Sequence, residues 1–369
     1  MASAGVTKMS APRERGWRWF VVAVSVVLVV TLAPSWPPAL ALAAAVVRLV
    51  FPFEQFALLA AVSLAGCALV GWWAGGRLVL TVVVIAVTGW LLWHVPLPSS
   101  SYGAFVRGWA IALSAAFALV CLAAGNSPFL GRALASVALA SVVSAAGLAS
   151  GQAVSGALFG TVRMLDEDYQ RRLDESLALW KARTESGVWQ TFAARVPSIA
   201  ARAELLATRL EELEHESETR SGSLLVLLAP SLLALESMLA LALGWASYHR
   251  LSRTRIGPPL GSLRDLRFND QLIWGLVVGA VMGLLPSLAP FRVAGLNLLC
   301  FFGALYALRG AGVLSWLIPE RAALPLLLVL VILVPVLGPV AVLMTVTVVC
   351  FGVGLSDTWR DFRARVQAR

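Results

Sequence analysis

Long apolar runs that are nearly free of charged residues dominate this chain. They cover residues 17–34, 37–51, 54–74, 77–95, 102–124, 129–162, 222–249, 271–289, 293–317 and 322–356. A soluble fold cannot bury that much apolar surface, whereas the hydrocarbon core of a bilayer accepts apolar runs of about 20 residues as transmembrane helices. The sequence therefore predicts an all-α fold, a polytopic transmembrane helical bundle.

Charged residues are scarce and unevenly placed. They make up 13% of the chain, about half the share found in soluble domains. The net charge is +9, but the basic residues flank apolar runs and do not form a dense cluster. This distribution favours contact with the lipid bilayer and its anionic headgroups. We expect no nucleic acid partner, because such binding depends on clustered phosphate contacts.

The basic residues predict how the chain is oriented. The tail 1–16, the loop 250–270 and the tail 357–369 are basic, so the positive-inside rule predicts that all three are cytoplasmic. Segment 163–221 is acidic overall and is expected outside the cytoplasmic (inner) membrane. The residues expected at lipid headgroups are Arg250, Arg253, Arg255, Arg264 and Arg267, with Trp359 at the interface.

The number of crossings follows from this orientation. Run 37–51 is too short for a comfortable crossing, and run 322–356 is too long for a single one. Two prolines break the long run, so we expect a tight hairpin with arms at 322–334 and 340–356. The total is then even, eight or ten, and we favour ten. Transmembrane halves at 17–162 and 222–356 would flank the external segment.

The external segment 163–221 has the pattern of amphipathic helices. Apolar residues recur at spacings of three or four residues, which places them along one stripe of a helix. They could pack on each other, lie at the membrane surface, or form a coiled coil with a second copy or another protein. The first stripe comprises Leu165, Tyr169, Leu173, Leu177 and Trp180, and the second Trp189, Phe192, Val196, Ile199, Ala203, Leu206, Leu210 and Leu213.

Three polar residues inside apolar runs are candidate ligand-binding residues. Glu236 lies near the centre of its run, where a carboxylate is normally paired, protonated or directed into a cavity. Its candidate partners are Arg309 and Arg107, or else nearby serines and the backbone. The other two candidates are Asn297 and Gln152. Polar faces of this kind line a shared cavity in some proteins and serve as interhelical hydrogen-bond partners in others.

Glycines recur at the spacing that lets helix backbones approach closely in a membrane. Gly275, Gly279 and Gly283 share one helix face, and Gly147 and Gly151 form a similar pair. We expect these glycines to serve helix packing within the chain.

The sequence shows no catalytic set, no metal signature and no phosphate-binding glycine loop. Its four cysteines lie far apart within apolar runs, and its three histidines are scattered, so we expect neither a disulfide framework nor a metal site. We expect no cofactor and no enzymatic activity, with an intramembrane enzyme as the remaining alternative.

The C-terminal half carries the residues of a family resemblance. They are RIGPPL at 255–260, LRFND at 266–270, NLL at 297–299, LYALRG at 305–310 and GLSDTWRDFR at 354–363. In these motifs the chain resembles the YybS-like family of bacterial multi-pass membrane proteins. That family's architecture is similar to the substrate-binding subunits of energy-coupling-factor transporters and to MreD.

Two functional hypotheses follow. The first is a membrane scaffold that binds other membrane proteins or a second copy of itself. The second, which the resemblance implies, is the membrane-embedded subunit of a transporter that binds a small solute. A cavity lined by the intramembrane polar residues would favour the second.

Overall fold

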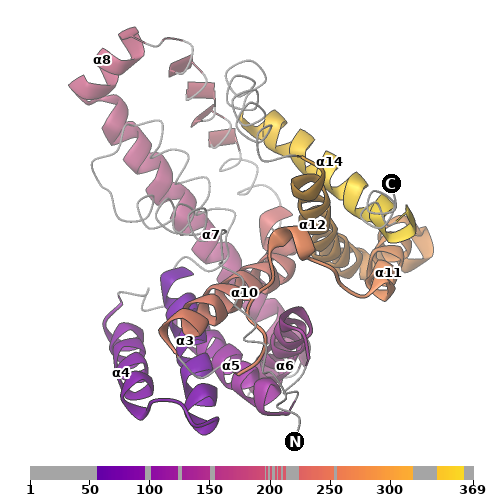
Figure 1. Cartoon of the computed structure of the whole chain (residues 1–369). Helices are drawn as coiled ribbons and strands as arrows, with labels where there is room; N and C mark the ends of the chain where they lie inside the picture. The colour runs from indigo at the N-terminus through magenta and orange to yellow at the C-terminus, as the bar shows by residue number, and fades with distance from the viewer. Residues whose placement is uncertain are drawn as a thin grey trace, which may run out of the picture.

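All the regular secondary structure in the part of the chain that the computed structural model describes is helical (Figure 1). Five of the described helices are long and apolar enough to cross a membrane: Phe56–Trp73, Tyr102–Ala123, Phe129–Gly147, Leu225–Leu251 and Pro286–Leu317. The described residues are 56–95, 101–123, 127–149, 154–195, 197, 200–201, 204–205, 207–208, 211–212, 224–252, 256–318 and 339–360. The tail 1–16, runs 17–34 and 37–51, arm 322–334 and residues 361–369 lie outside them.

Five helices form an N-terminal bundle. They are α3 (Phe56–Trp73), α4 (Leu78–His94), α5 (Ser101–Ala123), α6 (Phe129–Ala149) and α10 (Leu224–Leu251). The core between them is apolar and aromatic, and Leu59, Phe117, Leu241 and Trp245 are fully buried in it. Small residues allow close contact between the helices, because a Cβ on Gly244 of α10 would meet the α3 backbone at Leu64 N at 2.9 Å.

Three further helices form a C-terminal group beside α10 (Figure 1). They are α11 (Ile273–Leu284), α12 (Arg292–Leu317) and α14 (Pro339–Arg360), with the 3₁₀ segment η3 (Pro286–Phe291) between the first two. The α12–α14 crossing is very close: a Cβ on Gly310 would lie 1.7 Å from Cys350 O, and one on Gly354 2.0 Å from Tyr306 O. α14 covers the second expected arm of the hairpin.

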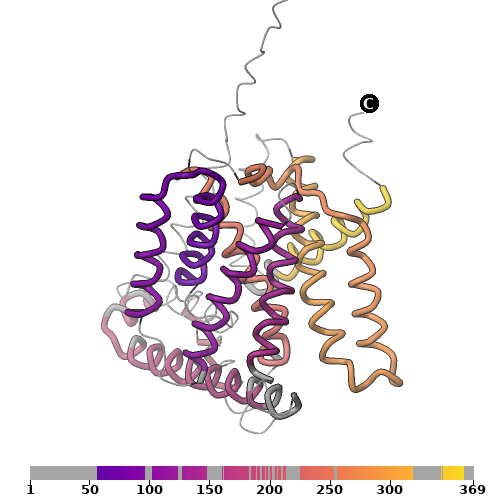
Figure 2. The backbone as a smooth tube through the Cα atoms, turned by 90° about the horizontal axis from the view of Figure 1, so that it is seen from below, coloured from indigo at the N-terminus to yellow at the C-terminus, as the bar shows by residue number. Residues whose placement is uncertain are grey.

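The long helix α7 (Val154–Thr184) lies across one end of the N-terminal bundle (Figure 2). It turns back at α8 (Gly187–Arg195), where the rings of Trp180 and Trp189 meet edge to face at 5.1 Å. α7 begins before residue 163, the expected start of this segment. We call this end of the molecule the hairpin end, after α7 and α8 and not after the expected arms 322–334 and 340–356.

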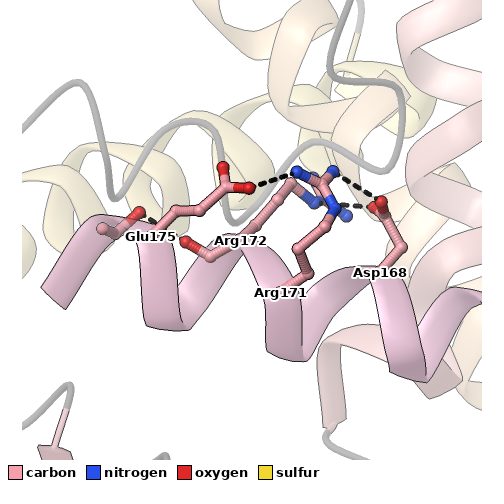
Figure 3. A network of polar contacts seen from close by, with 5 residues as sticks. Asp168, Arg171, Arg172 and Glu175 are labelled. Atoms are coloured by element: carbon pink, nitrogen blue, oxygen red, sulfur yellow. Dashed lines mark hydrogen bonds and ion pairs between the residues drawn. The ribbon is translucent and has the colours of Figure 1, made fainter. Parts of the chain in front are cut away.

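The predicted first stripe is the buried face of α7. Tyr169, Leu173, Leu177 and Trp180 are buried and Leu165 packs against them. In the second stripe Trp189 is buried, and most of the other members lie outside the described residues. On α7, Arg171 and Arg172 both pair with the buried carboxylate of Asp168, and Arg171 also binds Glu175 (Figure 3).

The opposite end, where α10 ends and α11 begins, carries the loop 252–272 and is called the loop end. Figure 2 shows this loop and the end of α14 on the side away from α7. The described parts of the loop 250–270, expected inside, and of segment 163–221, expected outside, therefore lie at opposite ends of the bundle.

Exposed tryptophans mark both ends. Trp72 and Trp73 close α3 at the loop end, where Gly71 packs against Tyr248 of α10. Trp90 and Trp93 lie in the last turns of α4, towards the hairpin end. The 17 residues of α4 span about 25 Å at the helical rise, close to the hydrocarbon thickness of a bilayer. Such exposed rings at two levels are typical of the aromatic belts of membrane proteins.

Candidate functional site: a loop anchored by buried side chains

The loop 252–272 contains no regular structure except two short 3₁₀ turns, η1 (Leu263–Asp265) and η2 (Asp270–Leu272), among its described residues. It includes two of the motifs that prompted the family resemblance. Side chains buried in the helices hold this loop at both of its ends, and that arrangement distinguishes it from an ordinary connection.

Arg132 is the first anchor. It lies in the first turn of α6 and is only 1% exposed, although it carries a permanent positive charge. Its Nη1 donates to Ile256 O at 3.1 Å, and its Nε donates to Ser127 Oγ at 3.2 Å. The guanidinium carbon also lies 5.2 Å from the ring centroid of Trp245, a cation–π arrangement. These contacts offset part of the cost of removing the charge from water.

Trp245 and His249 of α10 hold the next two carbonyl groups of the loop. Trp245 Nε1 donates to Pro258 O at 3.1 Å. His249 Nε2 lies 3.0 Å from Gly257 O, and its Nδ1 lies 3.0 Å from Trp245 O. A protonated ring can donate to both oxygens, whereas a neutral ring can donate to one. Three consecutive loop carbonyls, at residues 256 to 258, are therefore held by three different side chains.

Gly257 is required at the centre of this arrangement. Its φ is +148°, which side chains rarely adopt, and a Cβ there would meet the Arg132 Nη1 at 2.8 Å. The glycine therefore provides both the backbone conformation and the space for the guanidinium.

Arg309 of α12 is the second anchor. Its Nη1 donates to Asp270 Oδ1 at 2.7 Å and its Nε to Asp357 Oδ2 at 3.0 Å. The guanidinium carbon lies 5.3 Å from the ring centroid of Phe268. Arg309 was one expected partner of Glu236, but it instead joins the start of α11 to the end of α14. The other expected partner, Arg107, is exposed on α5.

Local hydrogen bonds shape the rest of the loop. Asn269 Oδ1 accepts from Gln271 N at 3.0 Å and caps η2. Ser262 Oγ donates to Asp265 Oδ2 at 2.6 Å across η1. Of the arginines expected at lipid headgroups, Arg250 and Arg267 are exposed and Arg264 is half-buried. Arg253 and Arg255 lie outside the described residues, and Trp359 is 68% exposed.

The intramembrane polar candidates are placed differently. Glu236 is 1% exposed in the middle of α10. Asn297 engages the α10 backbone with both atoms of its amide group: Oδ1 accepts from Ser231 N at 3.0 Å, and Nδ2 donates to Leu227 O at 2.7 Å. These are the two groups that a straight helix would join directly, and Pro230 lies between them. Asn297 thus joins two helices. Gln152 lies outside the described residues.

The glycines expected at helix contacts divide into two groups. A Cβ on Gly275 would meet the Phe302 ring at 2.3 Å, and one on Gly279 would meet Gly295 O at 3.0 Å. Gly283 has ordinary contact with Leu299 at 3.9 Å. All three lie where α11 packs on α12. Gly147 faces open space, and Gly151 is outside the described residues.

The comparison with known families supports the membrane assignment. Residues 176–355 match the family described as Predicted membrane protein (DUF2232). The DUF2232 match contains the loop, Trp245, His249 and Arg309, whereas Arg132 precedes it and Asp357 follows it. No curated protein and no solved structure matches this chain.

Sequence reasoning missed Arg132, Trp245 and His249. Their partners are backbone carbonyls, which carry no signature in the sequence. The available signals were an arginine in the first turn of an otherwise apolar run and a glycine followed by two prolines. Only the packing of α6, α10 and the loop shows that these three residues belong to one site.

Proposed function

We propose that this chain is a non-enzymatic, multi-pass membrane scaffold whose loop end presents residues 256–263 to a protein partner in the cytoplasm. The observation that carries this proposal is the capture of three consecutive carbonyls by Arg132, His249 and Trp245. Burying an arginine at the end of a membrane bundle is costly. A loop that is fixed at such a cost binds a partner with little further loss of conformational entropy.

The chemistry of the segment indicates the kind of partner. Pro258 and Pro259 are exposed, and Leu263 is 44% exposed. Ser262 has φ −65° and ψ 152°, which is polyproline II geometry. Exposed prolines close to a residue in this geometry fit an apolar groove lined by aromatic side chains. The adjacent Arg264 would favour a groove with an acidic rim.

The orientation is tested separately from the binding. The four native cysteines are replaced, and single cysteines are introduced at Leu205, 62% exposed at the hairpin end, or at the exposed Ser262 in the loop. We expect a membrane-impermeant thiol reagent added to intact cells to label only position 205. Labelling of both positions from one side would contradict the proposed topology.

The partner is tested by site-specific photocrosslinking in cells. A photoreactive residue at Leu263 is expected to give a discrete adduct with one protein, and the same residue at Leu205 is not. The variant Arg132→Ala should weaken the adduct at 263 while the chain remains in the membrane, because the carbonyl of residue 256 is released. An adduct of unchanged strength in that variant, or equal adducts at both positions, would contradict the proposal.

A second candidate function, a solute-binding subunit, is favoured by Glu236. A carboxylate 1% exposed at mid-helix is a usual mark of a substrate or proton site. Asn297 does not strengthen this candidate, because its amide is engaged with the α10 backbone. Binding of a copurified small molecule that is lost in Glu236→Gln but kept in Ser315→Ala would support it.

A further inference from the structure

The Arg309 ion pairs bring together two surface segments that lie far apart in the sequence. Asp270 opens η2 just before α11, and Asp357 lies in the last turn of α14. Because one guanidinium binds both carboxylates, the residues next to them share one region of the loop end.

Two tryptophans and two arginines lie within four residues of the paired aspartates along the chain. Trp274 follows Asp270 by one helical turn and is 65% exposed, and Trp359 follows Asp357 by two residues and is 68% exposed. Arg267 and Arg360, each three residues from one of the aspartates, are also exposed. In a membrane protein indole rings of this kind lie at headgroup depth.

We propose that Arg267, Trp274, Trp359 and Arg360 bind the headgroup of an anionic phospholipid at the loop end. The carboxylates of Asp270 and Asp357 face Arg309, so they oppose the lipid phosphate less than solvent-facing acids would. The flanking arginines leave the cluster with more positive than negative side chains. Guanidinium groups match phosphate oxygens in geometry, and the indole rings fix the depth at which the phosphate lies.

This site shares no residue with segment 256–263 and does not depend on the proposed protein partner. The proposed site should bind lipids with anionic headgroups more tightly than lipids with zwitterionic headgroups. It also predicts that the ion-pair cluster supports the site, since Arg309 binds one carboxylate from each of its two halves.

The test uses the full chain purified in detergent, with fluorescent phosphatidylglycerol as probe and fluorescent phosphatidylcholine for comparison. We expect the double variant Arg267→Gln/Arg360→Gln to bind phosphatidylglycerol about 25-fold more weakly. Each arginine near an anionic surface raises the affinity for that surface about fivefold. The matched control Arg163→Gln/Arg195→Gln removes two exposed arginines from the hairpin end and should leave binding unchanged.

Thermal unfolding of each variant shows whether its fold is intact, and Arg267→Lys/Arg360→Lys, which keeps the charge, should restore most of the binding. Equal affinity for the two lipids would overturn the proposal, as would equal losses in the double variant and its control. Full competition by millimolar inorganic phosphate would also overturn it, because the site would then be one for free phosphate.

Discussion

Replacing Asn297 by alanine should reveal how α10 tolerates a proline in its interior. Pro230 removes a backbone donor and its ring crowds the preceding turn. The Asn297 amide spans Leu227 O and Ser231 N at this point, at 2.7 and 3.0 Å. The variant removes two interhelical hydrogen bonds and leaves two backbone groups of α10 to find new partners.

The expected cost follows from these two groups. A buried polar group that loses its partner costs about 1–3 kcal/mol, whereas interhelical hydrogen bonds measured in membrane proteins contribute about 0.6 kcal/mol on average. Two such groups would cost about 2–6 kcal/mol by the first figure, and two such bonds about 1.2 kcal/mol by the second. Between these limits, we expect Asn297→Ala to lower the free energy of unfolding by about 2–3 kcal/mol. Ser315→Ala, which removes one local hydrogen bond of α12, should cost less than about 0.5 kcal/mol.

A double-mutant cycle with Pro230→Ala tests the reasoning directly. Without the proline, α10 can close the bond from Ser231 N to Leu227 O, so Asn297 is no longer needed there. The cost of Asn297→Ala should then fall below about 1 kcal/mol, a coupling of more than about 1 kcal/mol. The measurement is reversible unfolding in mixed detergent micelles, monitored by circular dichroism. An equal cost of Asn297→Ala with and without Pro230 would refute the bridging role.

Two further predictions concern the C-terminal helices. Gly310→Ala would place a Cβ 1.7 Å from Cys350 O, so we expect a loss of about 3 kcal/mol from overpacking. Gly352→Ala on α14 meets nothing within 4 Å and should change stability by no more than about 1 kcal/mol, in the stabilising direction; equal effects would contradict the α12–α14 crossing. Asp357→Asn should cost about 3 kcal/mol, because it breaks a buried ion pair. Asp270→Asn should cost less than about 1 kcal/mol, since that carboxylate is 59% exposed. A larger loss of unfolding free energy in Asp270→Asn than in Asp357→Asn would show that the buried Arg309–Asp357 pair is not the stronger of the two.

Within the described residues, the sequence by itself determined that the apolar runs are helical and which face of α7 is buried. Apolar runs without charge must satisfy every backbone group internally in a bilayer, so helices are the available solution for them. The stripe through Tyr169, Leu173 and Leu177 follows from the period of the helix alone. Both features, the helices and the buried stripe, depend only on residues that are close together along the chain.

Only the tertiary structure decided how the polar groups are paired. Arg309 binds Asp270 and Asp357, 39 and 48 residues away, because the three helices converge at the loop end. Asn297 finds its partners on α10 because α12 passes the proline there. Arg132 reaches the carbonyl of Ile256, 124 residues along the chain. A charge or amide in an apolar run shows that a partner is needed, but helix packing decides which group supplies it.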